Sequence, residues 1–185
     1  SDLVYDLKNL TGTETAKLHK RSELDIESFQ DTVRPIIQEV RENGDKAIIE
    51  YNRKFDKASM KSSDLKVTEE EFQRAEESLD KSIKEVIEKS AANIKKFHQA
   101  QMPEEMWFTQ ISEGILAGEK ITPITSVGIY VPRGKGSFPS VMLMLCIPAL
   151  IAKVPDIIVC TPPTPEGTVD DASLFTANIC GIKNI

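Results

Sequence analysis

The stretch that decides the fold is VGIYVPRGKGSFPSVMLMLCIPALIAKVPDIIVC, residues 127–160. A short β-branched run opens it, a loop with two glycines follows, and a long apolar run then leads to a second short apolar run, DIIVC. Short runs rich in β-branched residues are typical of buried strands, and the longer apolar run between them is typical of a buried helix. Strand, helix and strand in this order predict a parallel sheet with helical crossovers.

The residues that follow continue this alternation. DDASLFTANICGI, residues 170–182, predicts a second helix that ends at Gly181, and the last residues, IKNI, look like the start of another strand. A parallel sheet that stops there has an open edge, so we expect more chain or a partner chain to cover it. The prediction is an α/β fold in which a mainly helical region, residues 1–105, precedes an incomplete Rossmann-like parallel sheet, residues 106–185.

The loop between the first strand and the helix is a candidate ligand site. Ligands of open parallel sheets bind outside the carboxyl ends of the strands, and free amides at a helix start suit an anion. Gly134 and Gly136 permit close backbone approach, and Pro139 suits a first helical turn. The third glycine of the dinucleotide fingerprint is missing, however, so spacing alone supports a ligand loop and a plain structural turn equally.

The preceding region has helical periodicity from residue 22 to residue 102. Gly44 predicts the end of one helix, and Thr68 with Glu71 predicts the reciprocal capping pair of another. Pro35 is tolerated only in a first turn, which places the start of its helix at Asp31 or Thr32.

The longest predicted helix is DKSIKEVIEKSAANIKKFHQAQ, residues 80–101. One face is apolar and the other carries Lys and Glu, which we interpret as a solvated surface. The apolar face comprises Ile83, Val86, Ile87, Ala91, Ile94 and Phe97.

Composition excludes several classes of function. The chain has 185 residues, 40% of them hydrophobic, and a net charge of -6, which argues against a nucleic-acid partner. The opening SDLVYDLKNL lacks the features of a secretory signal, and no apolar stretch is long enough to span a membrane. We therefore expect a cytoplasmic protein with no membrane partner.

Cysteine, histidine and tryptophan offer little chemistry by themselves. The wide spacing of Cys146, Cys160 and Cys180 favours buried thiols in a reducing compartment. The two histidines stand far apart in the sequence, and neither has neighbours that complete a metal site. His98 is predicted to have a structural role, and Trp107 is predicted to pack between the two regions.

Several motifs in the same order resemble histidinol dehydrogenase. They are RENGDKAIIEYNRKFD, AANIKKFHQAQMP, VGIYVPRGKGSFPSVMLMLCIPALIAKV and DIIVCTPP, and the likeness runs from about residue 31 to residue 185. The resemblance implies a zinc-dependent homodimer that oxidises L-histidinol to L-histidine by two hydride transfers to two NAD molecules. By position in the motif, Tyr130 matches the tyrosine that contacts NAD, and Pro132 and Gly134 lie in the loop beside the cofactor.

The resemblance also implies what this chain does not carry. The zinc ligands and the Glu–His catalytic pair of the family correspond to sequence beyond residue 185, so we assign no catalytic or metal-binding residue and expect no histidinol oxidation by this chain alone.

Two positions depart from the family pattern. Arg133 stands where the family usually has glycine, and is either strained there or able to reach a cofactor phosphate. Pro155 stands where a glycine is common, which leaves the end of the preceding helix undefined. Two alternatives remain: a shortened, non-catalytic relative that acts as a nucleotide-binding or dimerisation module, and an unrelated protein whose loop is only a turn.

Overall fold

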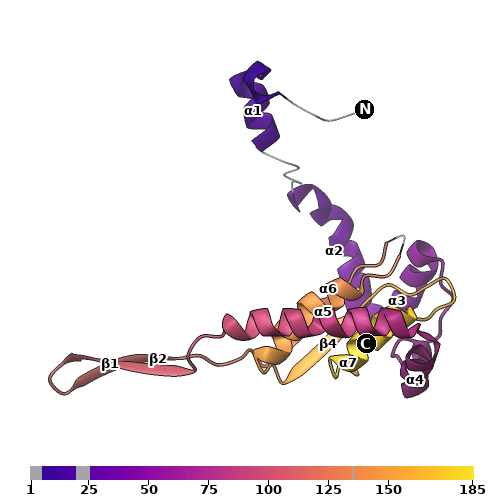
Figure 1. Cartoon of the computed structure of the whole chain (residues 1–185). Helices are drawn as coiled ribbons and strands as arrows, with labels where there is room; N and C mark the ends of the chain where they lie inside the picture. The colour runs from indigo at the N-terminus through magenta and orange to yellow at the C-terminus, as the bar shows by residue number, and fades with distance from the viewer. Residues whose placement is uncertain (1–5, 20–25, 135) are drawn as a thin grey trace. The chain divides into compact units, whose positions relative to one another are not determined.

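The computed structural model describes residues 6–19, 26–134 and 136–185 (Figure 1). The chain divides into two compact units, Ser1–Ala47 and Ile48–Ile185. Elements from both sides of residue 105 belong to the second unit, and the predicted division into regions 1–105 and 106–185 stays a prediction.

The first unit is helical. It contains the short 3-10 helix η1 (Leu7–Asn9), α1 (Gly12–His19), α2 (Ile26–Asn43) and the first residues of α3 (Asp45–Tyr51). Gly44 ends α2 with a φ of +54°, as predicted. The predicted start of this helix is wrong, because the chain is already helical at Ile26 and Pro35 lies in the helix interior. An exposed helix tolerates the proline because water reaches the carbonyl of Asp31, which loses its backbone partner.

Four helical elements of the second unit follow α3 and precede its strands. They are the π-helical turn η2 (Asn52–Asp56), the 3-10 turn η3 (Ser62–Asp64), α4 (Glu69–Ser78) and α5 (Lys81–Ala100). The predicted capping pair is confirmed: the backbone amide of Glu71 donates to Oγ1 of Thr68 at 3.3 Å, and the backbone amide of Thr68 donates to Oε2 of Glu71 at 2.9 Å. These two bonds satisfy amides that a helix start leaves without partners.

Two strands of the second unit form the predicted parallel pair. They are β3 (Ser126–Tyr130) and β4 (Asp156–Cys160), joined through α6 (Pro139–Ile151), and α7 (Asp171–Ile179) follows them. Tyr130 is in register with Cys160, so both strands end at the same edge. The carbonyl of Asn184 accepts a hydrogen bond from the backbone amide of Val159 at 2.9 Å, which places the last residues beside β4. The predicted α/β fold is confirmed.

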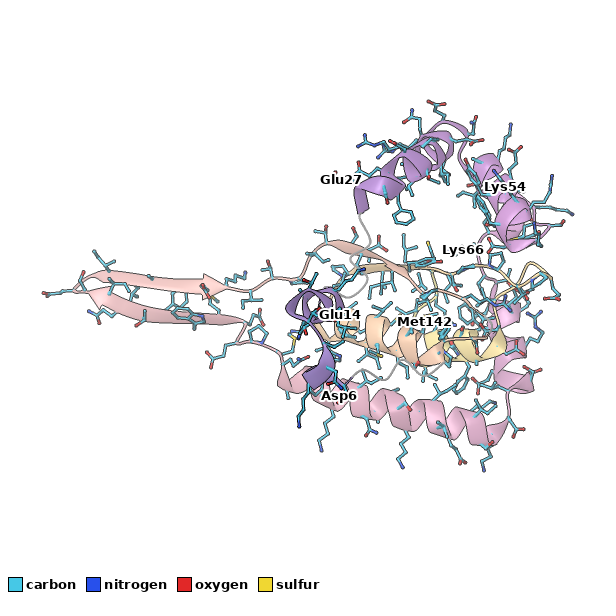
Figure 2. The ribbon with its side chains drawn as sticks, turned by 90° about the horizontal axis from the view of Figure 1, so that it is seen from above. Asp6, Glu14, Glu27, Lys54, Lys66 and Met142 are labelled. Atoms are coloured by element: carbon cyan, nitrogen blue, oxygen red, sulfur yellow. The ribbon has the colours of Figure 1, made fainter. Side chains whose placement is uncertain are left out.

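A separate hairpin stands before the parallel pair. Its strands, β1 (Met106–Ser112) and β2 (Ile115–Lys120), lie side by side (Figure 1), and side chains project from both faces of the ribbon (Figure 2). Every residue of both strands is exposed. The packing role predicted for Trp107 is therefore wrong, since its side chain lies in β1 and is 41% exposed.

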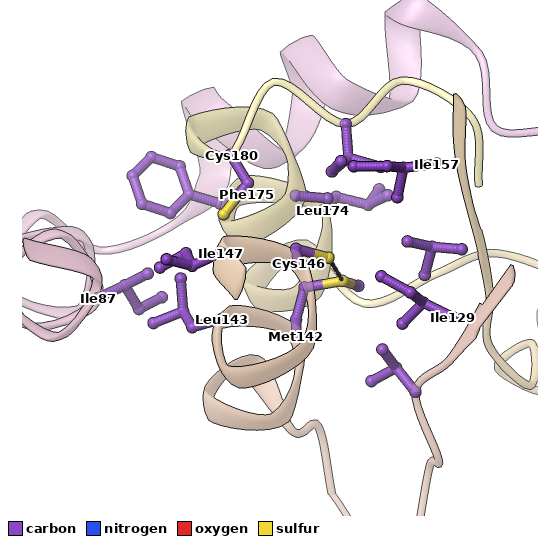
Figure 3. Packing of buried hydrophobic residues seen from close by; sticks show 14 of the residues in the cluster. Ile87, Ile129, Met142, Leu143, Cys146, Ile147, Ile157, Leu174, Phe175 and Cys180 are labelled. Carbon is purple, nitrogen blue, oxygen red and sulfur yellow. Dashed lines mark hydrogen bonds between the residues drawn. The ribbon is translucent and has the colours of Figure 1, made fainter. Parts of the chain in front are cut away.

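The core is built around α6, which is apolar on nearly every side. Leu143 and Ile147 lie on the side of Ile87 in α5, whereas Met142 and Cys146 lie toward Ile129 of β3 (Figure 3). A helix buried on two sides needs apolar residues on both, which accounts for the buried part of its apolar run, whereas Met144, Leu145 and Leu150 are exposed. Each of these side chains contributes about 2 kcal/mol by leaving water. Further core residues come from α7, namely Leu174, Phe175 and Ala177.

The apolar face predicted for α5 is only partly buried. Ile87 is enclosed, and Ala91 and Ile94 pack against the core, but Ile83 and Val86 are exposed. Phe97, at the other end of this face, is exposed as well. The periodicity identified the apolar face correctly, and the elements of this unit cover its middle section.

The end of α6 is well defined despite Pro155. The backbone amide of Val154 donates to the carbonyl of Ala149 at 3.1 Å, and that of Lys153 donates to the carbonyl of Leu150 at 3.0 Å. Lys153 adopts the left-handed conformation, with φ +59°. This pair of bonds is the Schellman motif, and a proline just after it does not disturb the helix.

Among the residues that the structure describes, no helix is long and apolar enough to cross a membrane.

Candidate functional site at the carboxyl edge of the parallel strands

The loop after β3 begins with alternating side-chain directions. Val131 is 1% exposed, and its backbone amide donates to the carbonyl of Cys160 at 2.9 Å, which extends the pairing of β3 with β4 by one step. Its neighbours Tyr130 and Pro132 are both exposed, Tyr130 by 61%. The buried valine therefore anchors the loop while the tyrosine ring and the proline face solvent at the strand end.

Gly134 is needed for space and not for an unusual backbone angle. Its φ lies outside the positive range, but a Cβ added to it would stand 3.3 Å from the ring of Phe138. A larger residue here would therefore require the Phe138 ring to shift by a few tenths of an ångström. The loop thus brings together the three predicted residues Tyr130, Pro132 and Gly134, since they lie within five consecutive positions.

A second loop leaves the same edge after β4. The backbone amide of Thr164 donates to the carbonyl of Thr168 at 2.7 Å, and the amide of Gly167 donates to the carbonyl of Thr164 at 2.8 Å. Gly167 supplies the positive φ, +80°, that this tight turn requires. The turn holds Glu166 at the strand edge.

Glu166 is a charged residue near Arg133 at the carboxyl edge of the strands, and the sequence analysis did not identify it. Its own backbone amide, then the Thr164 hydroxyl and the charge of Arg133, lower the pKa of the Glu166 carboxyl. The signal in the sequence was an acid inside the turn-forming run TPPTPEG that follows the second strand.

Arg133 is not strained. Its φ is not positive, which excludes the strained alternative for this position. The side chain is half-buried, and its Nε atom is enclosed without a hydrogen-bond partner among the described residues. An enclosed donor without an acceptor is uncommon in folded proteins and calls for an explanation.

One of the three cysteines is exposed, although all three were predicted to be buried. Cys146 and Cys180 are buried, as expected, whereas Cys160, the last residue of β4, is exposed. The alternation of β4 explains this, because Ile157 and Val159 turn inward and leave Cys160 on the other face. Burial, with the nearby Cys180, raises the pKa of the Cys146 thiol to about 12, and burial raises that of Cys180 to about 11.

Neither histidine belongs to one of the two loops. His98 is half-buried near the end of α5, where its Nδ1 lies 2.6 Å from Oε1 of Gln101 and its ring packs edge-on against Phe97. His19 is exposed at the end of α1 in the first unit. Within residues 6–19, 26–134 and 136–185, no three His, Cys, Asp or Glu side chains are grouped to hold a metal ion.

Comparison with known proteins bears on this geometry. A sequence profile described as histidinol dehydrogenase matches residues 19–185. The chain belongs to this family. The resemblance found in the sequence motifs is thereby confirmed.

Individual members of the histidinol dehydrogenase family show how much of it this chain covers. It is 46% identical over 98% of its length to a histidinol dehydrogenase homolog from Colwellia psychrerythraea, and covers 41% of that protein. It is 42% identical, again over 98% of its length, to the histidinol dehydrogenase of Synechocystis sp., and covers 42% of that protein. The chain thus spans about two-fifths of the length of these relatives.

The fold of this chain also matches part of a solved structure of the family. The crystal structure of histidinol dehydrogenase from Elizabethkingia anophelis superposes with a TM-score of 0.85 at 35% identity, over 96% of this chain and 40% of that one.

The two cofactors implied by the family fit this chain differently. The described residues do not fit zinc, because they present no ligand group of three. They do fit a dinucleotide at the carboxyl edge, because Arg133 offers an enclosed donor without an acceptor and Gly134 presents exposed backbone in the same loop.

Proposed function

We propose that this chain is the dinucleotide-binding part of an enzyme that oxidises L-histidinol to L-histidine with NAD and zinc, in histidine biosynthesis. Membership of the histidinol dehydrogenase family is the observation that carries the proposal. The two loops at the carboxyl edge of β3 and β4 support it, since open parallel sheets bind their ligands there.

The roles proposed for the loop residues follow from their exposure. Tyr130 offers an exposed aromatic ring at the end of β3, Pro132 keeps the backbone after it rigid, and Gly134 presents exposed backbone to the ligand. NAD, when bound, supplies the hydride acceptor. The chain's own contribution is to bind and orient the dinucleotide against the substrate.

We propose that catalysis also requires groups outside this chain. We assign the zinc ligands and the acid–base groups to sequence outside it, and propose a homodimer whose sites draw on both subunits. The unpaired state of its three cysteines is compatible with the proposed location in the cytoplasm.

The proposal is tested with the polypeptide that the gene encodes. NADH formation from L-histidinol is measured with zinc present, for the wild type, Tyr130→Ala and Tyr130→Phe. We expect Tyr130→Ala to weaken NAD binding about tenfold through the lost ring, and Tyr130→Phe to bind NAD nearly as the wild type does. An unchanged NAD affinity in Tyr130→Ala would contradict the assignment of this residue.

The 185-residue chain provides a second test. We expect no NADH formation from histidinol by this chain alone, because we assign the metal ligands and the acid–base pair to sequence outside it. Turnover proportional to its concentration would overturn that expectation.

The names of the relatives favour a second candidate. The Colwellia psychrerythraea relative, at 46% identity, is called only a homolog of histidinol dehydrogenase. Oxidation of a different alcohol on the same fold is therefore the alternative. Comparison of kcat/KM for L-histidinol with that for other amino alcohols and diols separates the two, since a histidinol dehydrogenase prefers histidinol.

A further inference from the structure

We propose that Arg133 binds a phosphate group of the dinucleotide and sets how tightly the loop after β3 holds its cofactor. The inference rests on the proposed function and adds to it a residue that selects the ligand by charge.

The Nε–H group of Arg133 provides the first argument. This donor is removed from water, and no acceptor among the described residues satisfies it. A buried donor without a partner costs free energy that a ligand oxygen would recover. The arrangement is therefore suited to a state in which an acceptor from outside the chain is present.

The charge of Arg133 provides the second argument. The ion pairs within 4.0 Å among the described residues do not include Arg133. Glu166 is close enough for its carboxyl to respond to the arginine, but it is exposed and forms no ion pair with it. The guanidinium keeps its charge and its fork of donors for a ligand, and that fork matches the oxygens of a phosphate.

The surroundings of Arg133 favour an anion. The same loop leads into α6, whose N-cap residue, Phe138, makes no side-chain capping hydrogen bond. Pro139 has no amide hydrogen, and the amide of Val141 donates to the carbonyl of Phe138 at 3.0 Å, so the helix start contributes mainly through its dipole. The positive end of the helix dipole and the guanidinium therefore act in one loop.

The exposed ring of Tyr130 identifies the anion more closely. An aromatic ring and a cation on one short loop suit a molecule with both a planar ring and a phosphate, which describes a nucleotide. L-Histidinol is an amino alcohol without an acidic group. Of the two molecules that react, only the dinucleotide carries the negative charge that Arg133 would recognise.

Binding measurements on the gene-encoded polypeptide test the inference. The dissociation constants of NAD and of adenosine, which has no phosphate, are measured by calorimetry for the wild type, Arg133→Met and Arg133→Lys. We expect the value for NAD to rise about tenfold in Arg133→Met and by less in Arg133→Lys, while that for adenosine stays unchanged. Arg74→Ala, which removes an exposed arginine from α4, is the matched control and should leave both values unchanged.

The melting temperature of the free protein separates binding from structure. Arg133→Met removes an unsatisfied donor, so the ligand-free variant should be at least as stable as the wild type. A lower melting temperature with unchanged NAD affinity would show a structural role and overturn the inference. Equal weakening of adenosine and NAD would overturn it too, as would a higher KM for the alcohol substrate with unchanged NAD affinity.

Failure of the proposed function gives a different result. If the wild type neither oxidises histidinol nor binds NAD, the proposed function fails, and AMP and ADP replace NAD as probes. Weaker binding of these by Arg133→Met would support phosphate recognition without the dehydrogenase. No binding of either by the wild type would overturn the inference as well.

Discussion

Lys153 is the position where the structure predicts a gain in stability from one substitution. It ends α6 in the left-handed conformation, with φ +59°, inside a complete Schellman motif. This conformation brings the Cβ of an ordinary residue too close to a carbonyl oxygen, at a cost of about 1–2 kcal/mol. Glycine has no Cβ, but it loses about 0.5–1 kcal/mol more backbone freedom on folding. Lys153→Gly should therefore raise the free energy of unfolding by about 0.5–1 kcal/mol.

The same motif at the end of α7 provides the reverse experiment. Gly181 has φ +70°, and the backbone amide of Ile182 donates to the carbonyl of Ala177 at 2.9 Å. A Cβ added to Gly181 meets no atom within 4 Å, so the backbone conformation alone sets the cost of Gly181→Ala. We expect this variant to lose about 0.5–1 kcal/mol.

Urea unfolding of the 185-residue chain, followed by far-ultraviolet circular dichroism, measures both effects. Lys153→Ala is the control, because it removes the lysine side chain and keeps a Cβ in the left-handed conformation. It should stay within about 0.5 kcal/mol of the wild type, as surface substitutions usually do. If Lys153→Gly has the same free energy of unfolding as Lys153→Ala, or a lower one than the wild type, the assignment of strain to this backbone angle is refuted.

Three further predictions concern exposed and buried groups. Cys160 should react rapidly with a thiol reagent at neutral pH, while Cys146 and Cys180 stay protected until the chain unfolds, because burial raises the pKa of their thiols; reaction of three thiols at one rate would contradict this. The contribution of the two buried, protonated thiols to the free energy of unfolding should be fully present below about pH 9, because their pKa values are raised in the folded chain. It should be lost as the pH rises toward these folded-state pKa values, which urea unfolding at increasing pH measures. The hairpin side chains Phe108 and Leu116, 64% and 69% exposed, should promote self-association of the 185-residue chain, so light scattering should report smaller particles for Phe108→Lys with Leu116→Lys; a monodisperse wild-type monomer would contradict this.

The local features of this fold could be predicted from the sequence because each depends on neighbouring residues. The capping pair of α4 requires Thr68 and Glu71 at a fixed spacing, and the helix ends at Gly44 and Gly181 require a residue that tolerates positive φ. Strand, helix and strand gave the parallel pairing of β3 with β4, because such a crossover has few other solutions.

The wrong predictions concern the burial of two side chains and the continuity of one helix, neither of which is determined by neighbouring residues in the sequence. An apolar sequence indicated that Trp107 and Cys160 are buried, but the hairpin that contains Trp107 is exposed, and alternation turns Cys160 outward. Pro35 was expected to limit its helix, yet the energy of one missing hydrogen bond is small against the remainder of α2. These outcomes depend on what each element packs against.

The candidate site combines both kinds of information. The loop after β3 could be found from its glycines and its place between a strand and a helix. The role of Glu166 beside Arg133 could not be found in this way, because it depends on the pairing of β3 with β4. The register of Tyr130 with Cys160 ends both strands at one edge, and this brings their loops together. The charge of Arg133 thereby reaches Glu166 and helps to lower the pKa of its carboxyl. The proposed charge recognition at this edge therefore depends on the parallel pairing, and a change of register between β3 and β4 should weaken it even if every loop residue were kept.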